Sequence, residues 1–178
     1  MPIADAASSI LMKAVPAKSY GSSAVLAARH FYSVPAGAKV LELAEEFRRR
    51  PELEVVAVVE EGGAPRGLIA RAALFDLLGK PFGLEILGRM VVSELAEPAP
   101  AVDMHASIFA VADEALGDAA ARPYRILVDE AGRFSGILSA RDLSEYLSRI
   151  TQEDIELAGV IQSRLEECNE VVGDPRYS

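Results

Sequence analysis

The sequence predicts an α/β (α+β) fold built from two pseudo-symmetric β-α-β-β-α units, packed sheet to sheet and followed by a long C-terminal helix. Two observations support this prediction. The first is an internal repeat, and the second is a change of apolar periodicity inside each copy, from helical to strand-like. With 178 residues, 51% of them hydrophobic and 25% charged, the composition is that of a globular protein.

The repeat consists of two pairs of matching stretches. "VPAGAKVLELAEEF" (34–47) aligns with "VDMHASIFAVADEA" (102–115), and "VAVVEEGGAPRGLIARAAL" (56–74) aligns with "RILVDEAGRFSGILSARDL" (125–143). Two copies are too few for a solenoid, which needs about three or more repeats to bury its faces. They suit a pseudo-symmetric pair in which each copy covers the apolar face of the other, and we expect neither copy to be stable alone.

Each copy predicts the same elements in the same order. Residues 39–49 place apolar side chains on one face at helical spacing. Residues 54–60 form a continuous β-branched run, which is typical of a buried strand. The turns at 61–65 and 129–132 each join two strands into a hairpin. Helices then follow, at 71–79 in the first copy and from residue 140 onward in the second.

The rest of the chain links and extends these copies. The predicted organisation is a partly helical N-terminal segment (1–29), the first repeat (30–78), a helical spacer (79–98), the second repeat (99–150), an amphipathic helix (151–172) and a tail (173–178). In the last helix, apolar residues recur every three or four positions on both sides of a break near Asp154. We expect Leu143 and Leu147 to pack on the core. Beyond Ile150, a two-stranded coiled coil in a homodimer and a helix that folds back are both open.

Charge and cysteine content exclude several classes of protein. The net charge of −9 argues against a nucleic-acid partner, which would require a basic face. No apolar run approaches the roughly 20 residues of a membrane span, and no basic leader precedes the first apolar patch, so we expect no membrane partner and a cytoplasmic location. The single cysteine, Cys168, suits a reducing compartment. His30 and His105 lack neighbours at metal-ligand spacing, so we expect no metal site and interpret both as loop or surface residues.

The last eight residues of the aligned stretches differ in polarity. "GILSARDL" carries Ser139 and Asp142 where "GLIARAAL" has Ala70 and Ala73. One interpretation is a helix cap, in which the hydroxyl of Ser139 accepts a first-turn N–H and the acid of Asp142 reaches back. The other is a ligand site, because free N–H groups at a helix start attract phosphate and a carboxylate accepts two hydrogen bonds from a ribose diol. In the second case Asp142 is an exposed helix acid, and its removal should abolish nucleotide binding while barely changing stability. The cap alone does not explain why one copy lacks the pair.

The order of these features resembles a tandem pair of CBS domains, the Bateman module, over about residues 30–150. The resemblance rests on an amphipathic helix, a buried strand that ends in an acid, a Gly turn, and then Gly, two hydrophobic residues, Ser or Thr, and Asp-Leu three residues on. "GILSARDL" matches this end motif at every motif position, whereas "GLIARAAL" keeps the frame without the polar pair. The segment "GRMVVSEL" resembles the spacer of CBS pairs in bacterial signalling proteins.

The resemblance implies a regulatory module that binds an adenine nucleotide (AMP, ADP or ATP) or S-adenosylmethionine in the second repeat. Ser139 and Asp142 would hold phosphate and ribose, and Arg141 would add charge toward a phosphate. The base would lie against Ala101, Val102 and Tyr124. The residues form no constellation of nucleophile, base or metal, so we expect no enzyme. The alternative is a dimerisation module with degenerate pockets, and in both cases an effector domain or partner protein would respond to the signal.

Overall fold

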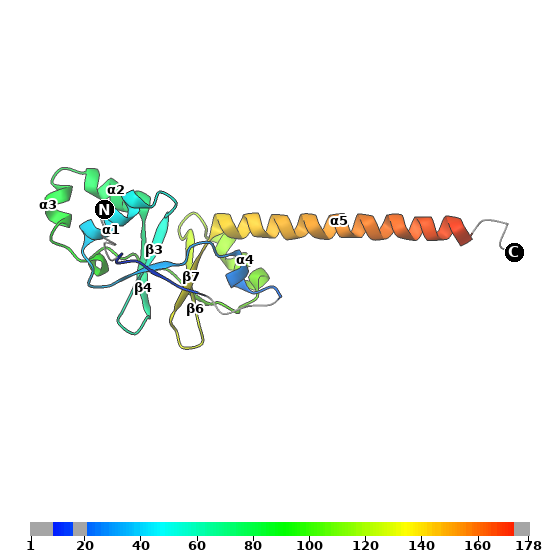
Figure 1. The fold of residues 1–178 in the computed structure, drawn as a ribbon, viewed down its shortest axis with the longest axis horizontal. Coiled ribbons are helices and arrows are strands. Elements are labelled where there is room, and N and C mark those ends of the chain that lie inside the picture. Colours follow the sequence, from blue (N-terminus) through cyan, green and yellow to red (C-terminus); the bar gives the residue numbers. More distant parts are fainter. Residues whose placement is uncertain (1–8, 16–20, 173–178) are drawn as a thin grey trace, which may run out of the picture. The chain divides into compact units, whose positions relative to one another are not determined.

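The computed structural model describes residues 9–15 and 21–172 (Figure 1). The chain divides into two compact units, one that ends at Leu143 and one that begins at Ser144. The elements in chain order are β1 (Met12–Lys13), η1 (Ala24–Ala27), β2 (Tyr32–Pro35), α1 (Val40–Arg49), β3 (Val55–Val59), β4 (Pro65–Ala70), α2 (Arg71–Gly79), α3 (Gly83–Leu87), η2 (Val92–Glu94), β5 (Ala101–Asp103), α4 (Ile108–Gly117), β6 (Tyr124–Val128), β7 (Phe134–Ser139) and α5 (Ala140–Val172).

The two repeats have the predicted β-α-β-β-α order, so the predicted fold class is confirmed. Strands form one sheet in the order β1-β2-β3-β4 and another in the order β5-β6-β7. In each repeat the first two strands are parallel and the last two form an antiparallel hairpin. Even the irregularities match, because the register shifts after the pair Val58–Gly67 in one hairpin and after the pair Leu127–Gly136 in the other.

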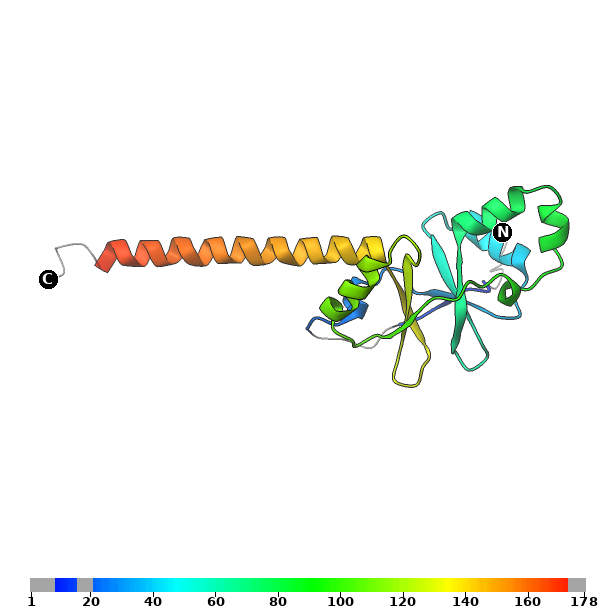
Figure 2. The same ribbon diagram turned by 180° about the vertical axis from the view of Figure 1, so that it is seen from behind.

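Strand β3 lies at the centre of the first compact unit and is buried on both faces. Val56 and Val58 point to the side covered by α1, whose amphipathic face buries Leu43 and Phe47 in the same apolar cluster. The alternate residues belong to a second cluster shared by the two repeats: Val55, Ala57, Val59, Leu68, Ile126 and Ile137. Burial on both faces explains why the strand is a continuous β-branched run rather than an alternating one. Figures 1 and 2 both show the two hairpins side by side.

Residues 21–31, which precede β2 and are called here the leading segment of the first repeat, pack on the second repeat. The backbone N–H of Ala24 donates to the carbonyl of Ala106 at 2.8 Å, and the N–H of Ile137 in β7 donates to the carbonyl of His30 at 2.7 Å. The segment before the second repeat makes the reciprocal contact, since Glu97 and Leu68 of β4 exchange two backbone hydrogen bonds of 2.9 Å. The pseudo-two-fold symmetry therefore includes an exchange of leading segments.

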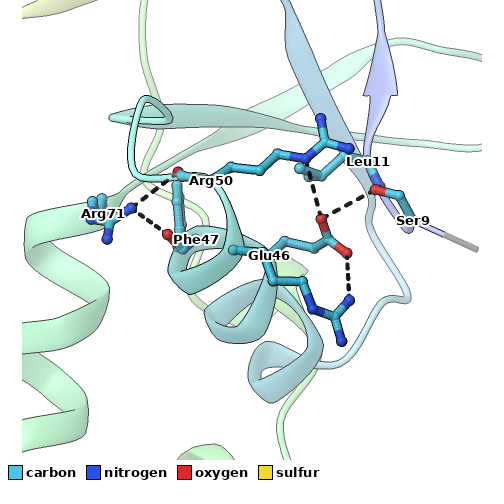
Figure 3. Close-up of polar contacts among 7 residues, drawn as sticks. Ser9, Leu11, Glu46, Phe47, Arg50 and Arg71 are labelled. Carbon is cyan, nitrogen blue, oxygen red and sulfur yellow. Dashed lines mark hydrogen bonds and ion pairs between the residues drawn. The ribbon is translucent and has the colours of Figure 1, made fainter. Parts of the chain in front are cut away.

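Buried polar contacts hold the ends of the first helix of each repeat. In the first repeat, the carboxylate of Glu46 contacts Ser9 at 3.2 Å and Arg50 at 3.7 Å, as Figure 3 shows, and Arg71 donates to the carbonyl of Arg50 at 3.3 Å. In the second repeat, the buried guanidinium of Arg125 donates to the carboxylate of Asp118, the residue that follows α4, and to the carbonyl of Arg122. A cation therefore lies near the C-terminus of each helix, although among the described residues it contacts the backbone of the helix itself only at α1.

Helix α5 is continuous through Asp154, so the break in the apolar pattern there does not interrupt the helix. The first compact unit ends at Leu143, which is fully buried, as the prediction that Leu143 packs on the core requires. The described side chains from 151 to 164 are exposed, among them Ile155 and Ile161. Within the described ranges, no helix has the length and apolar character needed to cross a membrane. The predicted tail 173–178 and the side chain of Cys168 lie outside what the structure describes.

Candidate functional site

Ser139 and Asp142 form a hydrogen-bonded pair at the junction of β7 and α5. The backbone N–H of Asp142 donates to Oγ of Ser139 at 3.0 Å, and that hydroxyl donates to Oδ2 of Asp142 at 2.6 Å. Ser139 therefore caps the helix as the first interpretation predicted. The pair is enclosed, since Ser139 is 8% exposed and Asp142 is 2% exposed. The expectation of an exposed Asp142 is wrong, because residues from the segment before the first repeat cover the first turn of the helix.

Those covering residues are Arg29 and His30. Nε2 of His30 lies 3.1 Å from Oδ2 of Asp142, and Nε of Arg29 lies 3.7 Å from Oδ1. The His30 side chain is only 13% exposed, and the residue lies between η1 and β2, so of the two predicted placements it has the loop and not the surface. Both carboxylate oxygens consequently have a basic partner, which offsets the free-energy cost of burying the charge. His105, in contrast, is exposed.

Two first-turn amides of α5 are already engaged, which changes how a phosphate could bind. The N–H of Ala140 donates to the carbonyl of Pro123 at 2.8 Å, and the N–H of Asp142 is bound to Ser139. The amides of Ala140 and Asp142 therefore have partners within the protein, and a phosphate would need other donors as well. The cations nearby are the guanidinium groups of Arg29 and Arg141, both on exposed side chains.

Tyr124 lies beside the pair, because it is the cross-strand partner of Ser139 between β6 and β7. Burial raises the pKa of its phenol, and the carboxylates of Glu54 and Asp142 raise that pKa further, while Arg141 opposes them. Arg141 itself contacts Glu54, with 3.6 Å between NH2 and Oε1. At neutral pH the phenol of Tyr124 is therefore uncharged, and it lies near the carboxylates of Glu54 and Asp142.

Ala101 and Val102 lie farther from the pair. They belong to β5, which pairs with β6 and not with β7, so the strand of Tyr124 separates them from Ser139. Sequence reasoning missed Arg29 and His30. The aligned stretches begin at residues 34 and 102, after the segments concerned, so the repeat alignment held no signal for this contact. Only the exchange of these segments between repeats brings His30 to Asp142.

The first repeat has an open cavity where the second repeat has its polar pair. Ala70 is the N-cap residue of α2 and makes no side-chain cap hydrogen bond. The cavity beside it measures about 160 Å³ and is lined by Leu68, Ala70, Glu97, Pro98, Ala99, Pro100, Ala121, Arg122, Pro123 and Tyr124. Typical small-molecule sites measure roughly 300–1,000 Å³, so this one accommodates a flat ring rather than a whole nucleotide. Tyr124 lies between this cavity and the polar pair.

A larger groove of about 730 Å³ lies at the hairpin turns, beside Lys13, His105 and Arg133. Its lining contains neither Ser139 nor Asp142, and its acid Asp129 is bound within the turn by Arg133. The backbone N–H of Arg133 is the main cause of a lowered pKa at Asp129. The groove is therefore separate from the candidate site, and its size alone does not make it one.

Comparisons with known proteins agree with this geometry. Residues 92–149 match the CBS domain family model. The CBS domain of the bacterial CNNM/CorC family Mg²⁺ transporter in complex with ATP is 18% identical over 70% of this chain and 85% of that chain, with a TM-score of 0.57. The structure of CBSX2 in complex with AMP is 17% identical over 74% and 99%, with a TM-score of 0.57.

A CBS domain-containing protein of unknown function from Kribbella flavida is 18% identical over 72% and 99%, with a TM-score of 0.58. A comparison with curated proteins finds no match. These likenesses are to structures that share the fold of this chain. Residues 92–149 are a CBS domain, and the chain has the fold of a tandem CBS-domain pair, as the motif resemblance predicted.

Proposed function

We propose that this chain is a regulatory module that binds an adenine nucleotide beside Ser139 and Asp142 of the second repeat. The observation that carries the proposal is the hydrogen bond of 2.6 Å between the hydroxyl of Ser139 and the carboxylate of Asp142. The first repeat has alanines at the two equivalent positions, and in the second repeat two arginines and a tyrosine lie next to the pair. A cap accounts for the serine, but the buried carboxylate requires basic partners that a cap does not need. Two structures of the same fold are described as complexes with ATP and with AMP, which adds support.

Each part of a nucleotide has a chemical counterpart at this site. The two oxygens of Asp142 match a ribose diol, since a carboxylate accepts several hydrogen bonds at once. Arg29 and Arg141 supply positive charge for phosphates through charge-assisted hydrogen bonds. The ring of Tyr124 offers an aromatic surface to the base, and the cavity next to it has room for a flat ring. Binding requires ribose hydroxyls to replace the donors that Asp142 has in this structure.

Calorimetric titration with ATP, ADP, AMP and S-adenosylmethionine tests the proposal. We expect the wild type to bind at least one of them. Asp142→Asn keeps the shape of the side chain but removes the charged acceptor, so affinity should fall by about 30- to 1,000-fold, which corresponds to roughly 2–4 kcal/mol. Asp76→Asn is the matched control, because Asp76 is an exposed acid on α2 that pairs with Lys80. Lack of binding for all four ligands, by the wild type and by a His30→Ala variant that lacks the imidazole beside Asp142, contradicts the proposal.

A second candidate is a dimerisation module whose pockets are degenerate. It is favoured by the enclosure of Asp142 and by the small volume of the cavity in the first repeat. Exposed apolar side chains on α4 (Phe109 and Leu116) and on α5 supply surfaces for a homodimer, through which a bound state would also reach an effector domain or partner protein. A dimer mass in light scattering, together with no heat of binding for any of the four ligands, selects this function.

A further inference from the structure

The side chain of His30 contacts the carboxylate oxygen that a ribose hydroxyl would need as its hydrogen-bond acceptor. Its Nε2 lies 3.1 Å from Oδ2 of Asp142, the same oxygen that accepts the hydroxyl of Ser139. Arg29 contacts the other oxygen, and the carboxylate is 2% exposed. A nucleotide at this site therefore competes with a side chain of the protein itself.

The backbone around His30 is fixed, so competition involves the side chain. The carbonyl of His30 accepts the N–H of Ile137 in β7, and η1 is bound to the turn before α4 through Ala24 and Ala106. The segment is therefore hydrogen-bonded to the second repeat at two places, Ala24 and His30. Rotation of the imidazole about its own side-chain bonds would release Oδ2 of Asp142 without breaking either backbone contact.

The first repeat provides an internal comparison. Glu97 is the counterpart of His30, because it pairs through its backbone with Leu68 as His30 pairs with Ile137. Next to Glu97, the position of Asp142 is taken by Ala73, and a cavity of about 160 Å³ is open. In the second repeat, the carboxylate is enclosed and a basic side chain of the segment before β2 contacts it. In the first repeat, the corresponding residue is the acid Glu97, and a cavity is open beside it.

We propose that His30 is an autoinhibitory residue that lowers the affinity of the second repeat for its nucleotide. The proposal rests on the nucleotide-binding function proposed above and names the contact that sets its strength. His30 holds Asp142 in the unliganded state, and a ligand binds only when its ribose hydroxyls replace the imidazole. Removal of the imidazole therefore makes the carboxylate available and tightens binding.

The test compares His30→Ala with His105→Ala, which removes the exposed histidine at the hairpin end of the molecule. In calorimetric titrations with ATP and AMP, His30→Ala should bind about 10-fold more tightly or better than the wild type. His105→Ala should bind as the wild type does. His30→Gln retains an N–H donor on a side chain of similar length and should return affinity toward the wild-type value. Thermal unfolding checks that each variant is folded.

Two results overturn the role of His30 and leave the proposed function intact. One is wild-type binding with equal or weaker binding by His30→Ala. The other is strict additivity of His30→Ala and Asp142→Asn in urea unfolding, since residues in contact show an interaction energy in a double-mutant cycle. Lack of binding by both the wild type and His30→Ala overturns the nucleotide-binding function itself. Binding by His30→Ala alone supports both proposals, because it identifies the wild type as the inhibited form.

Discussion

Gly67 and Gly136 occupy equivalent places in the two hairpins, and each lies against the segment that precedes the other repeat. A Cβ on Gly67 would lie 2.6 Å from the carbonyl oxygen of Glu97. A Cβ on Gly136 would lie 3.2 Å from ring carbons of Phe31 and 3.6 Å from the carbonyl oxygen of His30. Neither glycine has a positive φ, so close approach of the exchanged segments is what requires them.

We expect Gly67→Ala to be more destabilising than Gly136→Ala. At Gly67 the added methyl group would contact the backbone of Glu97, which cannot move without disturbing its hydrogen bonds to Leu68. Overpacking of this kind costs about 1–3 kcal/mol. At Gly136 the methyl group would contact the ring of Phe31, which is half-buried and can shift. Alanine also restricts the unfolded chain more than glycine does, and this effect offsets about 0.4–1 kcal/mol of the loss in stability. Urea unfolding of both variants measures the difference. Equal losses would mean that the two contacts are equally rigid.

Asp142→Ala should lower the free energy of unfolding by about 1–3 kcal/mol, because it leaves His30 and Ser139 without their buried acceptor. The matched control is Asp76→Ala, where loss of an exposed pair with Lys80 should cost about 0.5 kcal/mol or less. Chemical denaturation at neutral pH compares them. A loss at Asp142 as small as that at Asp76 would mean that the side chains around the carboxylate readjust at no cost.

Ser139→Ala should lower the free energy of unfolding by about 1 kcal/mol through loss of the helix cap. The first repeat allows the reverse experiment. Ala70→Ser combined with Ala73→Asp introduces the same pair at the start of α2, next to an open cavity, and should be tolerated with native circular dichroism. Unfolding of the double variant well below the wild-type temperature would show that the two frames are not equivalent.

Glu54→Gln should lower the pKa of Tyr124 without returning it to 10.0, because burial is the larger cause of the upward shift. Since the folded phenol has the raised pKa, the unfolded chain ionises first as pH increases. The corresponding stability is complete below pH 10 and is lost as pH rises through the folded pKa. Tyrosinate absorbance as a function of pH measures the shift in both proteins. An unchanged pKa in the variant would contradict the contribution of Glu54.

Truncation after Ile150 should leave the remaining chain folded, because the first compact unit ends at Leu143. We expect a cooperative thermal transition and unchanged near-ultraviolet circular dichroism. Loss of the near-ultraviolet signal with retained helix content would identify a molten state and move the boundary of the core into the later part of α5.

The sequence predicted those elements in which buried residues recur at a regular spacing along the chain. The run at 54–60 identified β3, and the spacing of Val40, Leu43 and Phe47 identified α1. The contrast between Ser139 and Ala70 identified the polar pair. The environment of Asp142 could not be predicted in the same way, because periodicity describes one element at a time and His30 reaches the pair from another element far along the chain. The contacts that cover Asp142 come from that segment, which the periodicity of α5 does not describe.

The exchange of leading segments has a consequence for how such a chain is made and how it arose. During synthesis the segment around η1 leaves the ribosome before the α4 and β7 backbone that it binds, so its docking waits until the second repeat is complete. A fragment limited to residues 99–150 would lack a piece of its own packing. In an ancestor with one repeat per polypeptide, the same geometry would have required two molecules to trade these segments, as in a domain-swapped dimer. On that view, gene fusion made permanent an association that already existed between separate chains.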